Sequence, residues 1–301
     1  MIPLFDGGVF FGGYWLMTNF KTTILANQEV APDYYRMKIL APEFDRRVRP
    51  GQFIMLRALE FGEPLLRRPF GVFQTGSLPA DCDGLPDKEF LEILYKVVGR
   101  GTTLLRGLHE GDRVEVLGPL GRGFETVAKS GQQILVGGGI GLVPLYMLAG
   151  ELVRQFPVRM LIGGRSRKDI LMVTEFERLG LETYVSTDDG TLGNAGPVTR
   201  VLERELDRFP DAAVYACGPM PMLEAVNGIC AARRVALQVS LEAFMACGVG
   251  ACLGCVVEGA GHSEEDPRYL CTCKEGPVFR AEELDWERLA RRVSEGGADH
   301  E

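Results

Sequence analysis

Four cysteines near the C-terminus have the spacing of an iron–sulfur site. Cys247, Cys252 and Cys255 form a C-x4-C-x2-C motif on a glycine-rich stretch, and Cys271 and Cys273 follow after a polar segment. This is the ligand spacing of plant-type [2Fe-2S] clusters, in which the fourth thiolate comes from a later segment. Glycines between the cysteines can adopt positive φ and let backbone N–H groups turn toward the sulfur atoms. The pattern therefore predicts a site that carries one electron at a time.

Zinc and disulfides are the alternative uses of such cysteines. Structural zinc favours paired C-x2-C knuckles, and only one such pair is present here, beside a C-x4-C. Disulfides need an oxidising compartment, and no secretory segment supports one. The spacing does not choose between Cys271 and Cys273 as the fourth ligand, because side chains two apart in an extended segment share a face. Cys82, Cys217 and Cys230 lie apart from the motif and are expected to be reduced thiols.

Two turns in the middle of the chain could border a dinucleotide cleft. At the first turn an apolar strand runs into glycines that would let a pyrophosphate approach a helix N-terminus. These glycines are Gly137, Gly138, Gly139 and Gly141. Pro144 stands where the full motif has its third glycine, so a tight turn without a ligand is the alternative. The second turn, Cys217 and Gly218, follows a later strand and could line the same cleft, although a lone cysteine is often just a small buried residue.

Two elements in the N-terminal third could hold an anion. Arg67 and Arg68 stand beside an apolar strand, where a guanidinium can pair with a phosphate and cover an aromatic ring system. Gly101 and Thr102 precede a short helical stretch whose amides and hydroxyls could form a second anion site. Together they suggest a flavin dinucleotide, and the alternative is two solvated arginines and an ordinary turn.

The elements that must position these residues fall into three segments. Residues 18–127 contain short alternating strands separated by turn residues, which predicts an antiparallel β-barrel. Residues 128–240 alternate strands and helices, which predicts a doubly wound parallel α/β domain. Residues 241–301 carry the cysteines and form a small cluster domain, so the predicted class is α+β multidomain. Residues 1–17 are an apolar, glycine-rich extension without a basic region, and we expect it to be disordered or to contact a partner.

Composition narrows the class of protein further. The chain has 301 residues, of which 46% are apolar, so it can bury substantial cores. The net charge of −8 argues against a non-specific grip on nucleic acid or an anionic membrane. We find no stretch long and apolar enough to cross a bilayer, and we expect a cytoplasmic protein.

Taken in order, these elements resemble the ferredoxin–NADP reductase superfamily, and within it the electron-transfer subunits of type B dihydroorotate dehydrogenase. The most specific match is the cysteine loop together with the segment from Cys273 to Phe279, which reads Cys-Lys-Glu-Gly-Pro-Val-Phe. In that family the last ligand directly precedes a short charged pair and Gly-Pro-Val-Phe. The resemblance therefore assigns the cluster to Cys247, Cys252, Cys255 and Cys273.

The resemblance also implies the flavin contacts. The family signature Arg-Pro-x-Ser corresponds here to Arg68, Pro69, Phe70 and Gly71, so Gly71 lacks the usual hydroxyl. The other FAD-contact positions of the family correspond to Leu94, Tyr95, Lys96, Gly101 and Thr102. Residues 186–190 match a segment of the family's nicotinamide domain.

The function that the resemblance implies is an electron relay in pyrimidine (UMP) biosynthesis. A partner catalytic subunit with FMN would oxidise dihydroorotate, and electrons would pass through the [2Fe-2S] cluster to FAD and then to NAD⁺. The relay needs no catalytic acid or base in this chain, and the family suggests a heterotetramer of two chains of each kind. The alternatives are FAD/[2Fe-2S] subunits of related NAD(P)H–ferredoxin, sulfide or sulfite oxidoreductases, or a zinc-binding scaffold. NADP is not excluded, because Arg165 and Arg167 could meet a 2′-phosphate, although near Asp169 they could equally be solvated loop charges.

Overall fold

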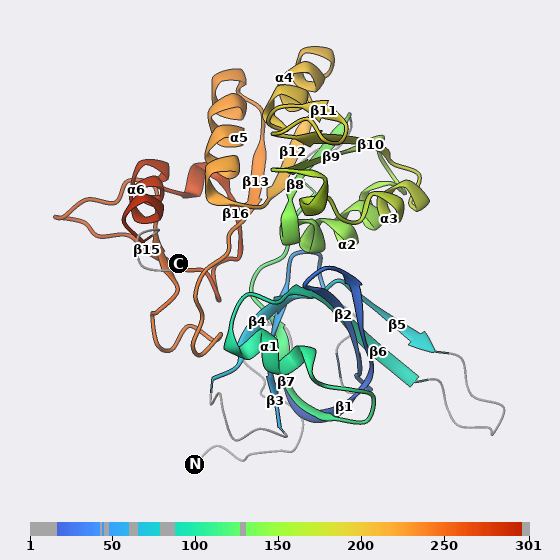
Figure 1. Ribbon diagram of the computed structural model, residues 1–301. Helices are drawn as coiled ribbons and strands as arrows, with labels where there is room; N and C mark the ends of the chain where they lie inside the picture. The colour runs from blue at the N-terminus through green and yellow to red at the C-terminus, as the bar shows by residue number, and fades with distance from the viewer. Residues whose placement is uncertain are drawn as a thin grey trace.

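The structure, a computed structural model, has three parts that follow one another along the chain (Figure 1). Cys82 and the predicted N-terminal extension up to residue 16 lie outside the described residues. The residues described are 17–42, 44, 48–59, 66–78, 88–126 and 131–296.

The first part is an antiparallel sheet that curves into a half-barrel, in the order β4-β3-β7-β1-β2-β6-β5. Strand β1 bends at register shifts, one of them between Ile24 and Ala26, so that it pairs with β7 along its first half and β2 along its second. The elements are β1 (Thr18–Ala31), β2 (Tyr34–Leu40), β3 (Phe53–Ala58), β4 (Arg68–Gly71), β5 (Gln74–Leu78), β6 (Lys88–Lys96), α1 (Arg100–Arg106) and β7 (Arg113–Leu120).

The second part is a parallel sheet flanked by helices, in the order β11-β10-β9-β8-β12-β13, and β16 joins it antiparallel beside β13. The chain order reverses between β8 and β12, which makes a topological switch point there. The elements are β8 (Gln133–Gly138), η1 (Gly139–Gly141), α2 (Leu142–Leu152), β9 (Val158–Gly164), η2 (Arg167–Asp169), α3 (Val173–Arg178), β10 (Glu182–Thr187), β11 (Asn194–Ala195), α4 (Thr199–Arg208), β12 (Ala213–Cys217), α5 (Met220–Arg233) and β13 (Leu237–Ser240).

The third part contains the cysteine loop and little regular structure. Its elements are β14 (Val256–Glu258), β15 (Tyr269–Cys271), β16 (Val278–Arg280), η3 (Ala281–Glu283) and α6 (Trp286–Gly296). Because β16 completes the second sheet, residues 278–280 belong to the same sheet as residues before 241. The predicted fold class, with an antiparallel flavin-type barrel, a doubly wound α/β domain and a small cluster domain, is confirmed.

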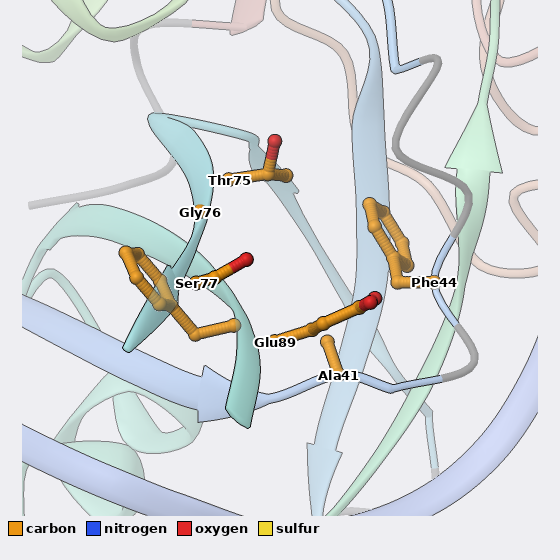
Figure 2. Close-up of a pocket in the computed structure, with 7 residues that line it drawn as sticks. Ala41, Phe44, Thr75, Gly76, Ser77 and Glu89 are labelled. Atoms are coloured by element: carbon orange, nitrogen blue, oxygen red, sulfur yellow. The ribbon is translucent and has the colours of Figure 1, made fainter. Parts of the chain in front are cut away.

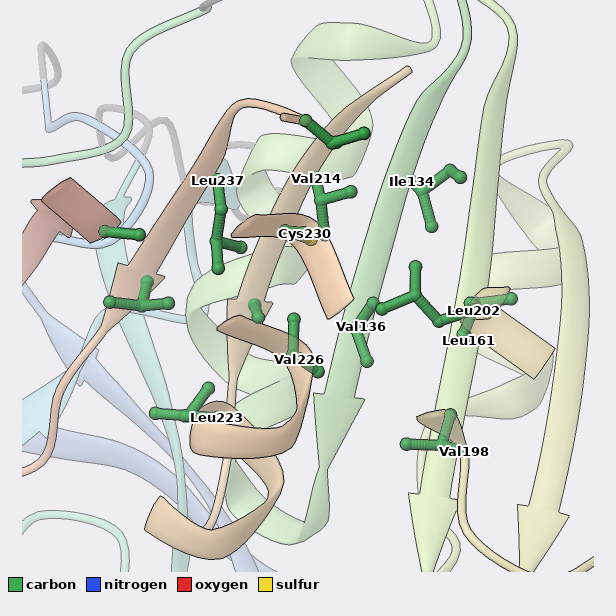
Figure 3. Packing of buried hydrophobic residues seen from close by; sticks show 14 of the residues in the cluster. Ile134, Val136, Leu161, Val198, Leu202, Val214, Leu223, Val226, Cys230 and Leu237 are labelled. Atoms are coloured by element: carbon green, nitrogen blue, oxygen red, sulfur yellow. The ribbon is translucent and has the colours of Figure 1, made fainter. Parts of the chain in front are cut away.

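The parallel sheet is buried on both faces because its strands are continuously apolar. In β8, Ile134 and Val136 pack on one face beneath α4 and α5 (Figure 3). Leu135 between them packs on the opposite face with α2. Leu202 of α4 and Val226 of α5 are both fully buried against the first face. This packing fixes the carboxyl ends of the strands, where the glycine turns lie.

The barrel and the α/β domain share one hydrophobic cluster. Phe73 of the barrel stacks on Tyr146 of α2 with ring centroids 4.5 Å apart and planes 18° apart. Arg36 lies over the Phe73 ring at 4.8 Å and its Nη2 atom lies 3.2 Å from Glu175 Oε1 of α3. Stacking, a cation–π contact and an ion pair therefore hold the two domains together.

Among the described helices, none has the length and apolar character needed to cross a membrane.

A buried ion pair between β9 and α4 allows the packing of this helix on the parallel sheet to be tested. Arg159 of β9 pairs with Glu205 of α4, whose side chain is 4% exposed, and also with Glu182 at 2.8 Å. We expect Glu205→Ala to cost about 3 kcal/mol of unfolding free energy, because it leaves the Arg159 charge buried without its closest partner. Urea denaturation monitored by circular dichroism measures this cost.

The matched control lies on the same helix. Asp207 pairs with Arg233 at 3.2 Å, but its side chain is 69% exposed. Asp207→Ala should change stability by no more than about 0.5 kcal/mol. Equal losses in the two variants would show that the Arg159 pair does not anchor α4 to the sheet.

Candidate redox centre

The cysteine loop lies directly on the barrel because a glycine stands at the contact. Gly248 has φ +74°, and a Cβ there would lie 2.5 Å from Cγ of Met55 in β3. Gly250 also has positive φ, +77°. Only glycine adopts this conformation readily and also leaves room for the Met55 side chain. Gly248 and Met55 therefore set how closely the loop approaches the sheet.

Four of the predicted ligand sulfurs come together as two pairs. The Cys247 side chain lies beside that of Cys252, and the Cys255 side chain beside that of Cys273. The backbone N–H of Gly250 donates to Cys273 Sγ at 3.0 Å, which ties the two parts of the site together across the loop. Two thiol pairs fit a [2Fe-2S] cluster, in which each iron takes two protein sulfurs.

Cys247 and Cys273 hold their protons differently. Burial opposes ionisation of Cys247, but hydrogen bonds from the backbone of Val249 and Cys252 outweigh it and lower the pKa to about 6. Burial and the contact with Cys255 raise the pKa of Cys273 to about 12. Cys247 is thus ready as a thiolate at neutral pH, whereas a metal would have to displace the proton of Cys273.

Cys271 takes a different place from its neighbour Cys273. It ends β15 and pairs with Val256 of β14, and its carbonyl accepts the N–H of Glu275 at 2.8 Å. Burial and then the Glu275 charge raise the pKa of Cys271.

Within the described ranges, all the cysteines are free thiols. In the same ranges, no three His, Cys, Asp or Glu side chains converge on a single ion position.

The sulfur site is buried on its barrel side and open on the other. Cys255 and Cys273 are 3% and 2% exposed and pack with Met55 and other barrel residues. Cys252 is exposed, and beside it Leu253 is 61% exposed with φ +58°. The structure therefore gives the site an inner face against β3 and β7 and an outer face toward solvent.

The two predicted dinucleotide turns touch each other at the switch point. A Cβ on Gly141 would lie 2.4 Å from the carbonyl oxygen of Cys217 and 2.7 Å from the N atom of Gly218. Gly139 has φ +56° and nothing within 4 Å of its would-be Cβ, so the turn opens to free space there. Gly137 packs instead on Leu142 inside the domain.

The remaining residues of this edge are also placed by packing. Gly138 lies against Met222 and Pro219, at the start of α5. Burial raises the pKa of Cys217 to about 12, so its thiol stays neutral at physiological pH.

In the barrel, the structure brings Arg68 and Gly101 together. A Cβ on Gly101 would lie 2.6 Å from Arg68 Nε, so the guanidinium lies directly on the start of α1. The Thr102 hydroxyl accepts the N–H of Val98 at 2.9 Å and thus fixes the turn. A Cβ on Gly71, at the end of β4, would lie 3.5 Å from Cγ1 of Val143 in the α/β domain.

The three predicted FAD-contact residues of strand β6 lie in different surroundings. Leu94 is buried in the cluster shared with the α/β domain, and Lys96 Nζ lies 5.3 Å from the Tyr34 ring centroid. Tyr95 points into the barrel core, where its hydroxyl donates to Asn27 and Phe70 meets its ring edge-on at 5.7 Å. Any cofactor contact by Tyr95 must therefore come from its backbone.

A separate pocket of about 160 Å³ opens at the other end of β6 (Figure 2). None of the predicted cofactor residues lines it, and it is too small for a dinucleotide. Its lining residues are Ala41, Phe44, Thr75, Gly76, Ser77, Glu89 and Phe90.

The sequence analysis did not identify Met55 as a residue of the redox centre, although the cysteine loop packs on it. The sequence hint to this contact is Gly248, which lies opposite Met55.

Comparison with known proteins identifies the family. Residues 242–285 match the iron–sulfur cluster binding domain of dihydroorotate dehydrogenase B, and residues 135–228 match an oxidoreductase NAD-binding domain. The chain is 38% identical over 269 residues to the dihydroorotate dehydrogenase B (NAD(+)) electron transfer subunit of Desulforamulus reducens, which covers 89% of this chain and 98% of the relative. The chain belongs to the family of dihydroorotate dehydrogenase B electron transfer subunits. The family resemblance predicted from the cysteine loop is thereby confirmed.

Further relatives agree with this assignment. A subunit of the same description from Geobacillus thermodenitrificans is 39% identical over 267 residues, 88% of this chain and 97% of the relative. A structure of an NADH-dependent reduced ferredoxin–NADP oxidoreductase is similar over 91% of this chain and 93% of that one, with TM-score 0.74 and 30% identity. The ferredoxin reductase of carbazole 1,9a-dioxygenase, at 22% identity and TM-score 0.61 over 73% of this chain and 67% of its own, shares the fold.

The contact between the two turns can be tested by adding one methyl group. Gly141→Ala must push the Cys217 carbonyl away, and we expect it to cost about 1–3 kcal/mol of stability. It should also weaken NADH binding, because both turns move. Thermal unfolding and a fluorescence titration with NADH measure the two effects.

Gly150 in α2 is the matched control, since nothing lies within 4 Å of its would-be Cβ. Gly150→Ala should stabilise the helix by up to about 1 kcal/mol and leave NADH binding as it is. Wild-type NADH affinity in Gly141→Ala would mean that the two turns do not form one nucleotide site.

Proposed function

We propose that this chain is the electron transfer subunit of a dihydroorotate dehydrogenase B, linking the FMN of a catalytic subunit to NAD⁺ through a [2Fe-2S] cluster and FAD. The main support is that Cys247, Cys252, Cys255 and Cys273 lie as two pairs against the barrel. In addition, relatives described as this subunit align with the chain over nearly their whole length. When bound, the cluster carries single electrons and FAD exchanges one or two, so that the chain joins one-electron transfer to hydride transfer.

The cluster site is formed by Cys247, Cys252, Cys255 and Cys273. The donor set is all thiolate, and the N–H of Gly250 already points at Cys273 Sγ, where it would stabilise negative charge on sulfur. Met55 and the other apolar residues beneath the loop keep water from the inner face.

The FAD site lies along β4, β6 and the start of α1. Arg68 would pair with a phosphate, and the backbone of Gly101 would approach the same group, because no side chain stands between them. Its residues are Arg68, Pro69, Phe70, Gly71, Leu94, Tyr95, Lys96, Gly101 and Thr102. At Gly71 a backbone group or water replaces the hydroxyl of the family signature.

The nucleotide site lies at the switch point of the parallel sheet. Its residues are Gly137, Gly138, Gly139, Gly141, Cys217 and Gly218. Gly139 offers its backbone to the pyrophosphate in the open space above the turn, and the neutral Cys217 thiol places no charge beside the nicotinamide. No residue of this chain acts as acid or base; its side chains bind, orient and exclude water.

The assembly that follows is a cytoplasmic heterotetramer of two such chains and two catalytic subunits, acting in pyrimidine biosynthesis. The three units would be a barrel at 18–127, a nucleotide domain at 128–240 and a cluster domain at 241–301, after an extension at 1–17. A subunit of an NADH-dependent ferredoxin–NADP oxidoreductase is the second candidate, because such a structure aligns with nearly the whole chain. Co-purification with the native catalytic subunit, followed by a dihydroorotate-dependent NAD⁺ reduction assay, decides between them.

Cys252→Ala tests the cluster and its place in the relay. We expect the variant to lose iron and acid-labile sulfide and to stop transfer from dihydroorotate to NAD⁺. NADH-dependent dye reduction should partly remain, because it needs only FAD and the nucleotide site. Iron and sulfide analysis and the two assays check this under anaerobic conditions.

Cys271→Ala is the control, since we place that residue outside the ligand set. It should retain the visible spectrum and the iron content of the parent protein. If Cys271→Ala loses the cluster while Cys273→Ala keeps it, the fourth ligand is Cys271. If Cys252→Ala keeps full transfer between the subunits, the relay order is wrong.

Gly101→Ala tests the FAD site. Its methyl group would displace the Arg68 guanidinium, so we expect FAD affinity to fall at least about tenfold, the value of one charge-assisted hydrogen bond. Gly99→Ala is the control two residues away, because nothing lies within 4 Å of its would-be Cβ and its φ is −174°. Equal FAD retention after gel filtration in the two variants would place the phosphate elsewhere.

A further inference from the structure

A threonine between the two late cysteines has a buried hydroxyl without a partner. Thr272 stands between Cys271 and Cys273 and is 0% exposed. Among the residues that the structure describes, its Oγ1 atom finds no hydrogen-bond donor or acceptor. A buried hydroxyl without a partner costs free energy, which a valine of similar shape would avoid. The unused hydroxyl is therefore free to serve an acceptor that the protein chain does not supply.

The backbone places this hydroxyl beside Cys255 and Cys273. In the β14–β15 ladder, Val256 pairs with Cys271. One step further along, the N–H of Thr272 donates to the Cys255 carbonyl at 3.1 Å. Residues opposite each other in an antiparallel ladder carry their side chains on the same face, with Cβ atoms about 4.5–5.5 Å apart. Thr272 thus lies opposite Cys255 across the ladder and next to Cys273 along the chain, and these two cysteine side chains lie beside each other.

A donor at this place would act in apolar surroundings. Cys255 and Cys273 are buried and pack with Phe53 and Met55 of the barrel. Within the described ranges, the backbone N–H that donates to Cys273 Sγ is that of Gly250, at 3.0 Å. The low dielectric of such a site strengthens each hydrogen bond to sulfur. A second donor at this pair would therefore add to the stabilisation of negative charge there.

We propose that the Thr272 hydroxyl donates a hydrogen bond to a sulfur of the bound cluster, on the side held by Cys255 and Cys273, and raises the reduction potential of the cluster. The inference rests on the proposed function, because it needs the [2Fe-2S] cluster in the site. On reduction the cluster gains one electron and no proton, and the hydroxyl keeps its hydrogen. Negative charge on sulfur grows with the added electron, so the donor stabilises the reduced form more than the oxidised form.

Thr272→Val tests this by removing the hydroxyl while nearly keeping the shape. The FAD- and cluster-loaded chain is titrated anaerobically with dithionite, and electron paramagnetic resonance measures the fraction of reduced cluster. We expect the equilibrium constant for one-electron reduction to fall about tenfold, which lowers the potential by about 59 mV. Thr272→Ser keeps the hydroxyl and should stay close to the parent potential. A threonine that only filled space would give the opposite order, because valine matches its shape better than serine.

Thr22→Val is the matched control in the barrel. Thr22 is also buried, at 8% exposure, but its hydroxyl donates to the Leu40 carbonyl at 2.7 Å. The variant loses a hydrogen bond between β1 and the end of β2, away from the cysteine loop, and should keep the parent potential. An equal shift in Thr22→Val and Thr272→Val would contradict the assignment of the effect to Thr272.

The hydrogen itself can be detected in the loaded protein. Electron–nuclear double resonance of the reduced cluster, in H₂O and in D₂O, reports exchangeable hydrogens close to the electron spin. We expect one such signal to be present in the parent protein and in Thr272→Ser and missing in Thr272→Val. Thr272→Ala gives the same comparison with a smaller side chain, so the assignment does not depend on how well valine is accommodated.

The outcomes separate this inference from the function beneath it. An unchanged potential in Thr272→Val, or an equal shift in Thr272→Val and Thr272→Ser, overturns the hydrogen bond. If the complex still reduces NAD⁺ with dihydroorotate in that case, the proposed function stands. If the parent chain holds neither iron nor acid-labile sulfide, both proposals fail.

Discussion

The contact between Gly248 and Met55 is the constraint on which the redox centre depends. A side chain at position 248 would overlap Cγ of Met55, so the cysteine loop can rest on the barrel only while glycine stands there. The buried thiols of Cys255 and Cys273 lie in the same apolar cluster as Met55, with residues of β3 and β7. The spacing of the cysteines would be the same without it, but the loop could not approach β3 this closely.

Close approach of backbone recurs at each of the other candidate sites. Gly101 lets the Arg68 guanidinium lie on the start of α1, and Gly141 lets two strand-end turns touch. At each position a Cβ would overlap a neighbouring group, the Arg68 guanidinium or the Cys217 carbonyl. Glycine thus permits close contacts between the elements that we propose bind the phosphate groups of the cofactors.

The pattern of the fold was predictable because it comes from local periodicity. The alternating strands of the barrel and the strand–helix alternation after residue 130 gave the right class, and the cysteine spacing gave the family. The sequence could not show that β16 joins the parallel sheet, because a strand of three residues has no period to detect. Nor could it show that Tyr95 faces the barrel core, since that depends on the register with β2 and on Asn27. The stack of Phe73 on Tyr146 joins residues far apart in sequence and has no local signal at all.

The asymmetry of the cysteine site fits an electron relay. Its inner face is buried against the domain that we propose holds FAD, and its outer face leaves Cys252 and Leu253 exposed. Electron exchange with another protein requires close approach, and only the outer face allows it. The apolar inner face keeps water out and lowers the local dielectric, while the N–H of Gly250 offsets negative charge on sulfur. Under the proposed function the chain holds a cluster and a flavin in different surroundings, and that task requires no acid–base residue.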